Sequence, residues 1–205
     1  MVGDPEALLQ TWFGEDLDTP QVVSARSRLW FSADESFDDF VRQQFGALPD
    51  RALRGDFDVW HEAARSTLAL VIALDQLPRN LFRGTLRAFA YDAAATHCSQ
   101  QALARKLDWE LHPVEAAFLY FPLEHAEELQ LQAQSVEGFR ALLESAPAPL
   151  RDEFASFLSY AERHAAVIQR FGRFPHRNAV LGRPSTPEEI EYLEEGGETF
   201  DSTHR

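Results

Sequence analysis

The chain has 205 residues, of which 45% are hydrophobic and 12% aromatic, and it carries a formal net charge of -14. This composition indicates a folded globular protein rather than a disordered one. The acidic charge also argues against a nucleic-acid partner, because phosphate binding requires a broad basic face. The only cysteine is Cys98, which excludes an internal disulfide and a four-thiolate metal site.

The N-terminus and the apolar runs indicate the cellular location of the protein. The first residues include acids where a secretory signal has basic residues. The longest aliphatic run, residues 68–74, is far shorter than the ~20 residues of a membrane-spanning helix. We therefore expect a cytoplasmic protein with no membrane partner and no nucleic-acid partner. The length fits a single domain over 1–205, in which the acidic residues 196–205 are expected to form a flexible tail.

Helical signals dominate the first half of the chain, and no alternating strand of useful length is present. An Asp-Pro pair predicts a capped helix over 4–14. Apolar residues at i, i+3, i+4, i+8 and i+11 predict another helix over 36–48. Ser66 is expected to cap a buried helix that ends at Pro78. These patterns favour an all-α protein.

The second half of the chain has the same character. An Ala-rich stretch predicts one long helix over 85–106, and further helices are expected over 124–143 and 151–170. Pro122 is expected to interrupt the chain before the first of these further helices. A cap, a first-turn proline and a capping-box acid over 186–189 predict a last short helix. The sequence thus predicts an all-α fold of seven to nine helices.

Asp75 is a candidate site residue because it follows seven aliphatic residues. A buried carboxylate that lacks a partner is destabilising by several kcal/mol, so a cation should lie beside it. The available cations are Arg79, Arg83, Arg173 and Arg177. The pairing has two interpretations: an ion pair that holds two helices together, or a carboxylate that orients a ligand-binding arginine.

His125 lies in a second polar block. On the expected helix, His125, Glu128 and Gln132 fall at i, i+3 and i+7 and share one face. A His-x-x-Glu pair can bind a divalent metal, but helical di-metal sites require such ligands from four helices, and this pair occurs once. We therefore expect a polar network here, with no metal ion and no cofactor.

The third block is basic: five arginines and no acidic residue occur over 163–183. His164 lies on an apolar stripe of the helix in this block, and its expected partner is Glu124 or Glu128. The chain cannot stay helical from Gly172 through Pro175, so a turn follows. The side chains expected to project from that turn are Arg173, His176, Arg177 and Asn178.

Five blocks, spread in order over nearly the whole chain, carry a family resemblance. They are WFG (12–14), LWF (29–31), LALVIALDQLPRNLFRGTLRAFAYD (68–92), FLYFPLEHAEE (118–128) and RHAAVIQRFGRFPHRNAVLGRPSTPEE (163–189). In these blocks the chain resembles the bacterial domain-of-unknown-function family 924. The resemblance implies a tetratricopeptide-like fold, in which antiparallel helix pairs stack into a compact superhelix. It implies no assigned activity.

Three functional hypotheses follow, and the sequence leaves them open. The first is a small-molecule site for an anionic ligand, whose ligand-binding residues are Asp75, Arg79, Arg83, Arg173, His176, Arg177 and Asn178. Whether this site is catalytic is left open, and the acid–base candidates are His125, Glu128 and His164, with Glu127 as a further carboxylate. The second hypothesis is a helical scaffold that binds a protein or peptide in a concave groove. The third is that the arginines are purely structural.

Overall fold

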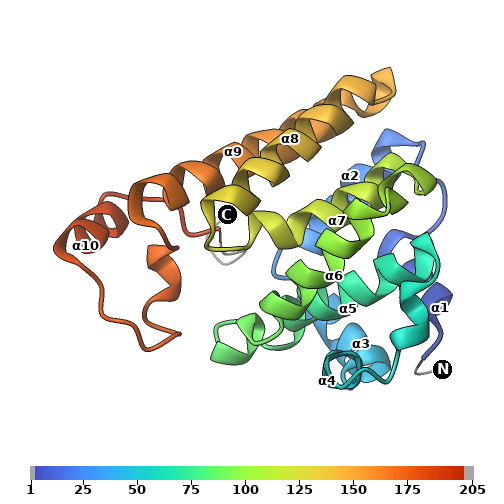
Figure 1. Cartoon of the computed structure of the whole chain (residues 1–205), viewed down its shortest axis with the longest axis horizontal. Coiled ribbons are helices and arrows are strands. Elements are labelled where there is room, and N and C mark those ends of the chain that lie inside the picture. The colour runs from blue at the N-terminus through green and yellow to red at the C-terminus, as the bar shows by residue number, and fades with distance from the viewer. Residues whose placement is uncertain (1–2, 201–205) are drawn as a thin grey trace.

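The computed structural model describes residues 3–200, and over that range the chain is all-α, with ten α-helices, five short 3-10 helices and no strand (Figure 1). The α-helices are α1 (Pro5–Phe13), α2 (Pro20–Phe31), α3 (Glu35–Phe45), α4 (Leu48–Leu53), α5 (Ala64–Leu81), α6 (Asp92–Ala104), α7 (Pro113–Glu124), α8 (Leu129–Ser145), α9 (Arg151–Phe171) and α10 (Pro187–Glu194). The 3-10 helices are η1 (Asp58–His61), η2 (Leu86–Phe89), η3 (Leu107–Glu110), η4 (Ala148–Leu150) and η5 (Pro175–Arg177).

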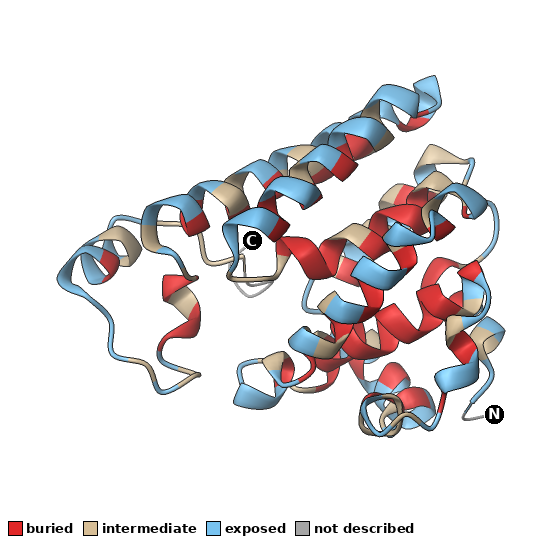
Figure 2. Cartoon of the chain, viewed as in Figure 1, coloured by how far each residue is buried: buried red, intermediate tan, exposed pale blue. Residues whose placement is uncertain are grey.

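The main hydrophobic core surrounds α5. All but three of its eighteen residues are buried, and it packs against α1, α3, α4, α6 and α7 (Figure 2). A helix that is apolar all round is stable only when other helices cover every side, which is the arrangement seen here. Asp75, on this central helix, is therefore fully buried.

The C-terminal part of the chain has a smaller core of its own. Helices α8 and α9 pack along each other, the chain beyond α9 turns back so that η5 contacts the main body, and α10 lies at the far end of the molecule (Figure 1). Val167, Ile168 and Phe174 form this second apolar cluster. Polar side chains from α5, α6, α7, α9 and η5 meet where the main body and the C-terminal part join.

Several predicted helices and caps are confirmed. Helix α9 matches the prediction over 151–170, whereas the helix predicted over 36–48 is confirmed only to Phe45, because residues 46–47 form a turn and Leu48 begins α4. Asp4 accepts a hydrogen bond from the Glu6 amide, and a full capping box opens α10. Gly172 ends α9 at a φ of 70°, a left-handed conformation that favours glycine. These features are local, so the sequence pattern alone predicts them.

The predicted ends of the central helix are wrong. Helix α5 begins at Ala64, and the Ser66 hydroxyl, instead of capping it, donates to the main-chain carbonyls of Trp60 and Ala63. Pro78 lies inside the helix, which continues to Leu81. Burial on every side stabilises the last turn sufficiently to offset the hydrogen bond that proline cannot donate.

The predicted long helix over 85–106 is also wrong in its first part. Residues 86–89 form η2, and α6 begins only at Asp92. Tyr91 is buried and its hydroxyl bonds Asp50, while Leu86 is left 59% exposed. Tertiary contacts of this turn therefore override the helical propensity of the alanines.

The predicted helix over 124–143 is interrupted. Pro122 lies inside α7, which ends at Glu124, and α8 starts four residues after His125. The amide of Gln132 on α8 donates to the main-chain carbonyls of Glu124 and Ala126, at 2.6 and 2.7 Å. These bonds satisfy carbonyls that the end of α7 leaves free, and they stabilise the break. The expected single face for His125, Glu128 and Gln132 does not exist.

Gly138 offers a direct test of how closely α7 and α8 approach. A Cβ atom at this position would overlap the ring of Tyr120 on α7. Alanine normally stabilises a helix relative to glycine, but here we expect Gly138→Ala to destabilise the protein by about 1–3 kcal/mol because of overpacking. Urea denaturation measures the change, and an increase in stability would contradict the close packing of the two helices.

Within residues 3–200, no helix combines the length and the apolar character that crossing a membrane requires.

Candidate functional site

The centre of the candidate site is a histidine held by a buried carboxylate. Nδ1 of His125 lies 2.8 Å from Oδ1 of Asp75, whose side chain is 1% exposed. Arg79 lies 3.1 Å from the same oxygen, and the Gln76 amide donates to the other oxygen at 2.7 Å. Both carboxylate oxygens thus accept hydrogen bonds. The ring of His125 is fixed in one orientation, with its second nitrogen directed away from Asp75.

A second histidine–carboxylate pair lies beside the first. Nδ1 of His164 lies 3.1 Å from Oε1 of Glu124 and 2.9 Å from the carbonyl oxygen of Tyr160. The centres of the His125 and His164 rings are 6.2 Å apart. Because a main-chain carbonyl can only accept, Nδ1 of His164 carries the proton. The prediction that Glu124 or Glu128 would be the partner of His164 is confirmed for Glu124.

Arg177 links these pairs to the C-terminal part of the chain. It is 6% exposed, and NH1 donates to the carbonyl of His125 at 2.9 Å. Its guanidinium group lies against the rings of Phe174 and Phe89, 4.3 and 4.8 Å from their centres. The nearest carboxylate is Asp92, at 3.6 Å. Arg177 is thus a buried cation that is held mainly by aromatic rings and a carbonyl.

Burial and neighbouring charge set different protonation states for the two carboxyl groups. Burial acts to raise the pKa of Asp75, but the charge of Arg79 and the bond from His125 outweigh it and lower that pKa to about 2. The pKa of Glu124 is raised well above its usual value by burial and by the negative charge of Asp75. Asp75 is therefore ionised, whereas Glu124 holds its proton more tightly than an ordinary glutamate.

The three histidines are neutral for a related reason. Burial is the main factor that lowers the pKa of His125, and that of His164 well below the usual value. Burial and the charge of Arg177 lower the pKa of His176 to about 3. Burial also lowers the pKa of Arg177 to about 10. Since Asp75 is ionised and can only accept, Nδ1 of the neutral His125 carries the proton and Nε2 has a free lone pair.

The structure brings together Asp75, Arg79, His125, His164 and Arg177. These five residues, together with Glu124 and Asp92, are called the junction cluster. His176 lies next to Arg177 and 5.7 Å, ring to ring, from Phe174.

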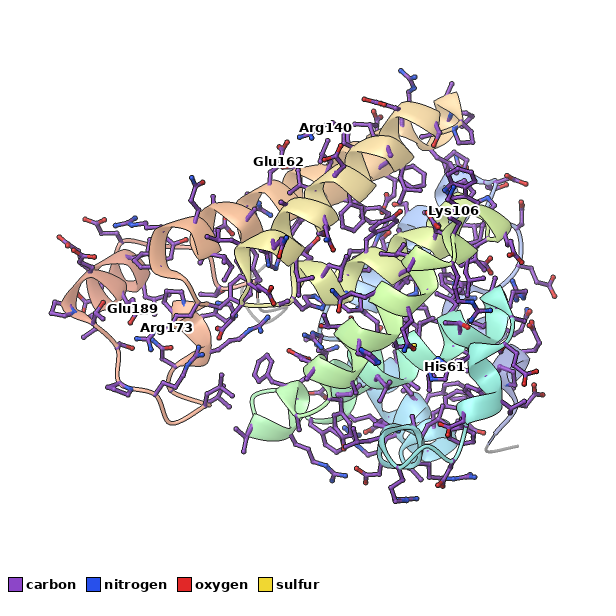
Figure 3. All side chains as sticks on the ribbon, in the orientation of Figure 1. His61, Lys106, Arg140, Glu162, Arg173 and Glu189 are labelled. Carbon is purple, nitrogen blue, oxygen red and sulfur yellow. The ribbon has the colours of Figure 1, made fainter. Side chains whose placement is uncertain are left out.

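Two other predicted arginines are engaged elsewhere. Arg83 binds Asp38 of α3, with Nε 2.6 Å from Oδ2. Arg173 binds Glu189 of α10, and the labelled side chains lie side by side at the end of the molecule away from the main body (Figure 3). Asn178 donates to the same Glu189 at 3.1 Å. The contact of Arg83 with Asp38 joins the chain after α5 to α3, and the contacts of Arg173 and Asn178 with Glu189 join the chain around η5 to α10.

The two glutamates expected as acid–base partners do not pair with a histidine. Glu127 accepts from Arg183 at 2.6 Å and from the main-chain amide of Phe174 at 2.8 Å. Glu128 is exposed at the start of α8. The interruption after α7 turns both residues away from the face that the helical pattern predicted. The carboxylates that pair with His125 and His164 are Asp75 and Glu124.

Asp92 is the site residue that sequence reasoning missed. It accepts two hydrogen bonds from Arg79, at 3.0 and 3.2 Å, and lies at the first position of α6. An acidic residue in a first helical turn is a recognised signal. The signal was hidden because residues 85–106 read as one continuous helix, which places Asp92 in its interior.

No group of three His, Cys, Asp or Glu side chains within residues 3–200 is arranged to hold a metal ion. Within the segment expected to form a tail, Phe200 stacks on the ring of His164, and Glu198 binds Arg163 at 3.0 Å. The rest of that expected tail, 201–205, lies outside the described residues.

Comparisons with known proteins agree on a family and leave its activity open. A solved structure of a protein of unknown function from Agrobacterium tumefaciens, ATU0120, is similar to this chain with a TM-score of 0.79 and 34% identity. The match covers 94% of this chain and 97% of that protein. Comparison with curated proteins gives no match. The model of a bacterial protein family of unknown function, DUF924, matches residues 8–197, so the chain belongs to the DUF924 family.

Proposed function

We propose that the protein binds a small anionic molecule at the junction cluster and that Nε2 of His125 accepts a proton there. The observation that carries this proposal is the pairing of a neutral, partly accessible histidine with a fully buried, ionised Asp75, directly beside Arg79 and Arg177. Perturbed titratable groups that converge from distant segments are typical of functional sites.

His125 has the features of a proton acceptor. Asp75 fixes its tautomer, as a carboxylate does for the base of a catalytic triad. No described residue forms a hydrogen bond with Nε2, and the side chain is 14% exposed. The side chains of Arg79 and Asp92 are likewise partly accessible, at 19% and 20% exposed. We propose that the ligand reaches the free lone pair of His125 through this partly exposed part of the junction cluster.

Arg177 supports the choice of an anion. Arg79 has close contacts with two carboxylates, whereas Arg177 has one carboxylate at 3.6 Å. The lowered pKa of Arg177 shows that burial outweighs the compensation that its neighbours provide. An anionic group would supply the missing compensation, and the planar guanidinium group suits a carboxylate or a phosphate.

A scaffold that binds a peptide is the alternative, and the surface hollows favour it. One hollow of about 370 Å³ lies between α4, α5 and α6, with Phe57, Leu70 and Leu74 in its lining. A second, of about 350 Å³, lies between α7 and α8 beside the exposed Trp109. Neither is lined by the junction cluster, so the two candidate functions use separate surfaces. Of the two candidate functions, the peptide-binding scaffold is the one that would use a tetratricopeptide-like superhelix.

Replacement of Arg177 by Met tests the anion site. Methionine matches the apolar surroundings and Asp92 keeps its bonds to Arg79, so we expect the unfolding free energy of Arg177→Met to be unchanged or higher. Sulfate, phosphate or a dicarboxylate should raise the melting temperature of the wild type, and this rise should disappear in the variant. Thermal unfolding with and without each anion measures both effects.

Arg140→Met is the matched control, because Arg140 forms an exposed ion pair with Glu162 on the outer side of α8 and α9. It should respond to anions as the wild type does. If no anion stabilises the wild type and Arg177→Met melts far lower, Arg177 is structural and the proposal is wrong.

A further inference from the structure

The chain after α10 folds back onto α9 and covers one of the two paired histidines. It returns along α9 (Figure 1), and the ring of Phe200 stacks on the ring of His164, with the ring centres 3.5 Å apart and the planes at 20°. The rings of Phe174 and His176 also face Phe200, and the centre of each is 5.9 Å from its centre. His164, beneath this ring, is 4% exposed. Phe200 therefore covers the junction cluster on its α9 side.

Few contacts hold this segment, residues 196–200, which we call the strap. Glu198 binds Arg163 of α9 at 3.0 Å, and the two side chains of this ion pair are 35% and 40% exposed. The amide of Glu198 donates to the hydroxyl of Tyr192 at 2.8 Å. The last two residues of the strap form no main-chain hydrogen bond with another described residue. Because an exposed ion pair contributes little to stability, the stacked ring provides the main contact between the strap and α9.

The backbone of the strap indicates where it can move. The amides of Gly196 and Gly197 donate to the carbonyls of Leu193 and Tyr192, so the start of the strap is attached to α10. Gly196 has a φ of 84°, a conformation that glycine adopts readily. Phe200 has a φ of 54°, which is unfavourable for a bulky side chain. The ring contacts maintain this strained conformation, and the strain is released when the contacts are lost.

We propose that the strap is a lid over the junction cluster: residues 198–200 move away from α9 about the two glycines and uncover His164, while η5 stays in place. The exposed ion pair, the strained backbone and the absence of main-chain bonds at the end of the strap all favour local opening. The lid controls the access of any small molecule to His164. The inference therefore goes beyond the proposed function and does not require that the ligand is an anion.

Reaction of His164 with diethyl pyrocarbonate, a small reagent that acylates accessible imidazole nitrogens, measures how often the lid is open. Peptide mass spectrometry gives the rate at each histidine, and the exposed His97 is the internal reference. We expect Phe200→Ala to increase the rate at His164 by about tenfold or more, because the substitution removes the covering ring. Phe40→Ala, at an exposed position of α3, is the matched control and should leave the rate at His164 unchanged.

A second variant tests whether the strap moves as a unit. Glu198→Gln removes the ion pair with Arg163 but keeps the ring of Phe200, so the rate at His164 should increase about two- to fivefold. Raising the salt concentration from about 0.05 M to about 1 M should increase the rate in the wild type but not in Glu198→Gln, because salt screens an exposed ion pair. The urea midpoints of this variant and the wild type should agree, since the pair contributes little to global stability.

Three results would overturn the inference. An unchanged rate in Phe200→Ala means that the ring does not protect His164. A raised rate in Phe200→Ala without any effect of Glu198→Gln or salt means that the ring moves alone and that the strap does not open. A rate that rises only where the urea midpoint falls means that His164 reacts through unfolding of the whole protein. None of these results depends on anion binding, so the proposed function is tested separately.

Discussion

Replacing Asp75 by Asn is expected to lower the free energy of unfolding by about 3–5 kcal/mol. The three side chains that bond its carboxylate, from Gln76, Arg79 and His125, are all donors. An amide NH2 in place of one oxygen faces donors instead of bonding them. The substitution also removes the charge that compensates buried Arg79, so it combines an unsatisfied polar group with an unpaired cation.

Urea denaturation at neutral pH measures this loss. Asp56→Asn is the matched control, because Asp56 forms exposed ion pairs with Arg51 and Arg54 and the same chemical change there should have little effect. If Asp75→Asn is no less stable than this control, Asp75 does not hold the junction cluster together.

Stability is also expected to fall as the pH is lowered below about 6.5, the ordinary pKa of histidine. His125, His164 and His176 have lowered pKa values in the folded protein. Between the unfolded and folded values the unfolded chain binds more protons, so each unit of acidification favours unfolding. Glu124 acts in the opposite direction, because its pKa is raised in the folded state. The effect of the three histidines is expected to exceed the opposite effect of the one glutamate, so the free energy of unfolding should decrease as the pH is lowered.

His176 gives this expectation a magnitude. Its pKa is about 3 in the folded protein, so the free energy of unfolding decreases gradually as the pH falls below about 6.5. The loss that His176 causes reaches roughly 2–3 kcal/mol at about pH 4.5. Urea denaturation at several pH values should therefore show a smaller acid loss for His176→Gln than for the wild type. His97→Gln, at an exposed position on α6, should keep the wild-type slope. Equal slopes for both variants and the wild type would show that burial of His176 has no such effect.

The parts of the fold that follow from the sequence are those that a few neighbouring residues decide. The cap at Asp4, the capping box at Thr186 and the glycine stop at Gly172 each depend on contacts within one helical turn. Pro78 and Pro122 were expected to end or interrupt helices, yet α5 and α7 continue past them because packing against neighbouring helices stabilises the last turns. Such packing is not visible in a local pattern.

The candidate site, like the fold, was predictable from the sequence only in part. The types of residue and the need of Asp75 for a cation were predictable, because buried charge requires compensation wherever it occurs. Which arginine would compensate it was not predictable: Arg79 lies beside it, while Arg83 and Arg173 bind Asp38 and Glu189. The sequence gives these arginines similar surroundings, and only the arrangement of distant helices distinguishes them.

The position of Asp92 has a consequence for how η5 behaves. It bonds Arg79 of α5 through both oxygens and attracts Arg177 of η5, so one carboxylate serves both the main body and the C-terminal part. Lifting η5 off the body would break the hydrogen bond from Arg177 to the carbonyl of His125 and would expose Phe174 and Asn178, which are buried. We therefore expect η5 to open only together with the main body. Its amide protons should exchange with solvent in the same cooperative unit as the central helices.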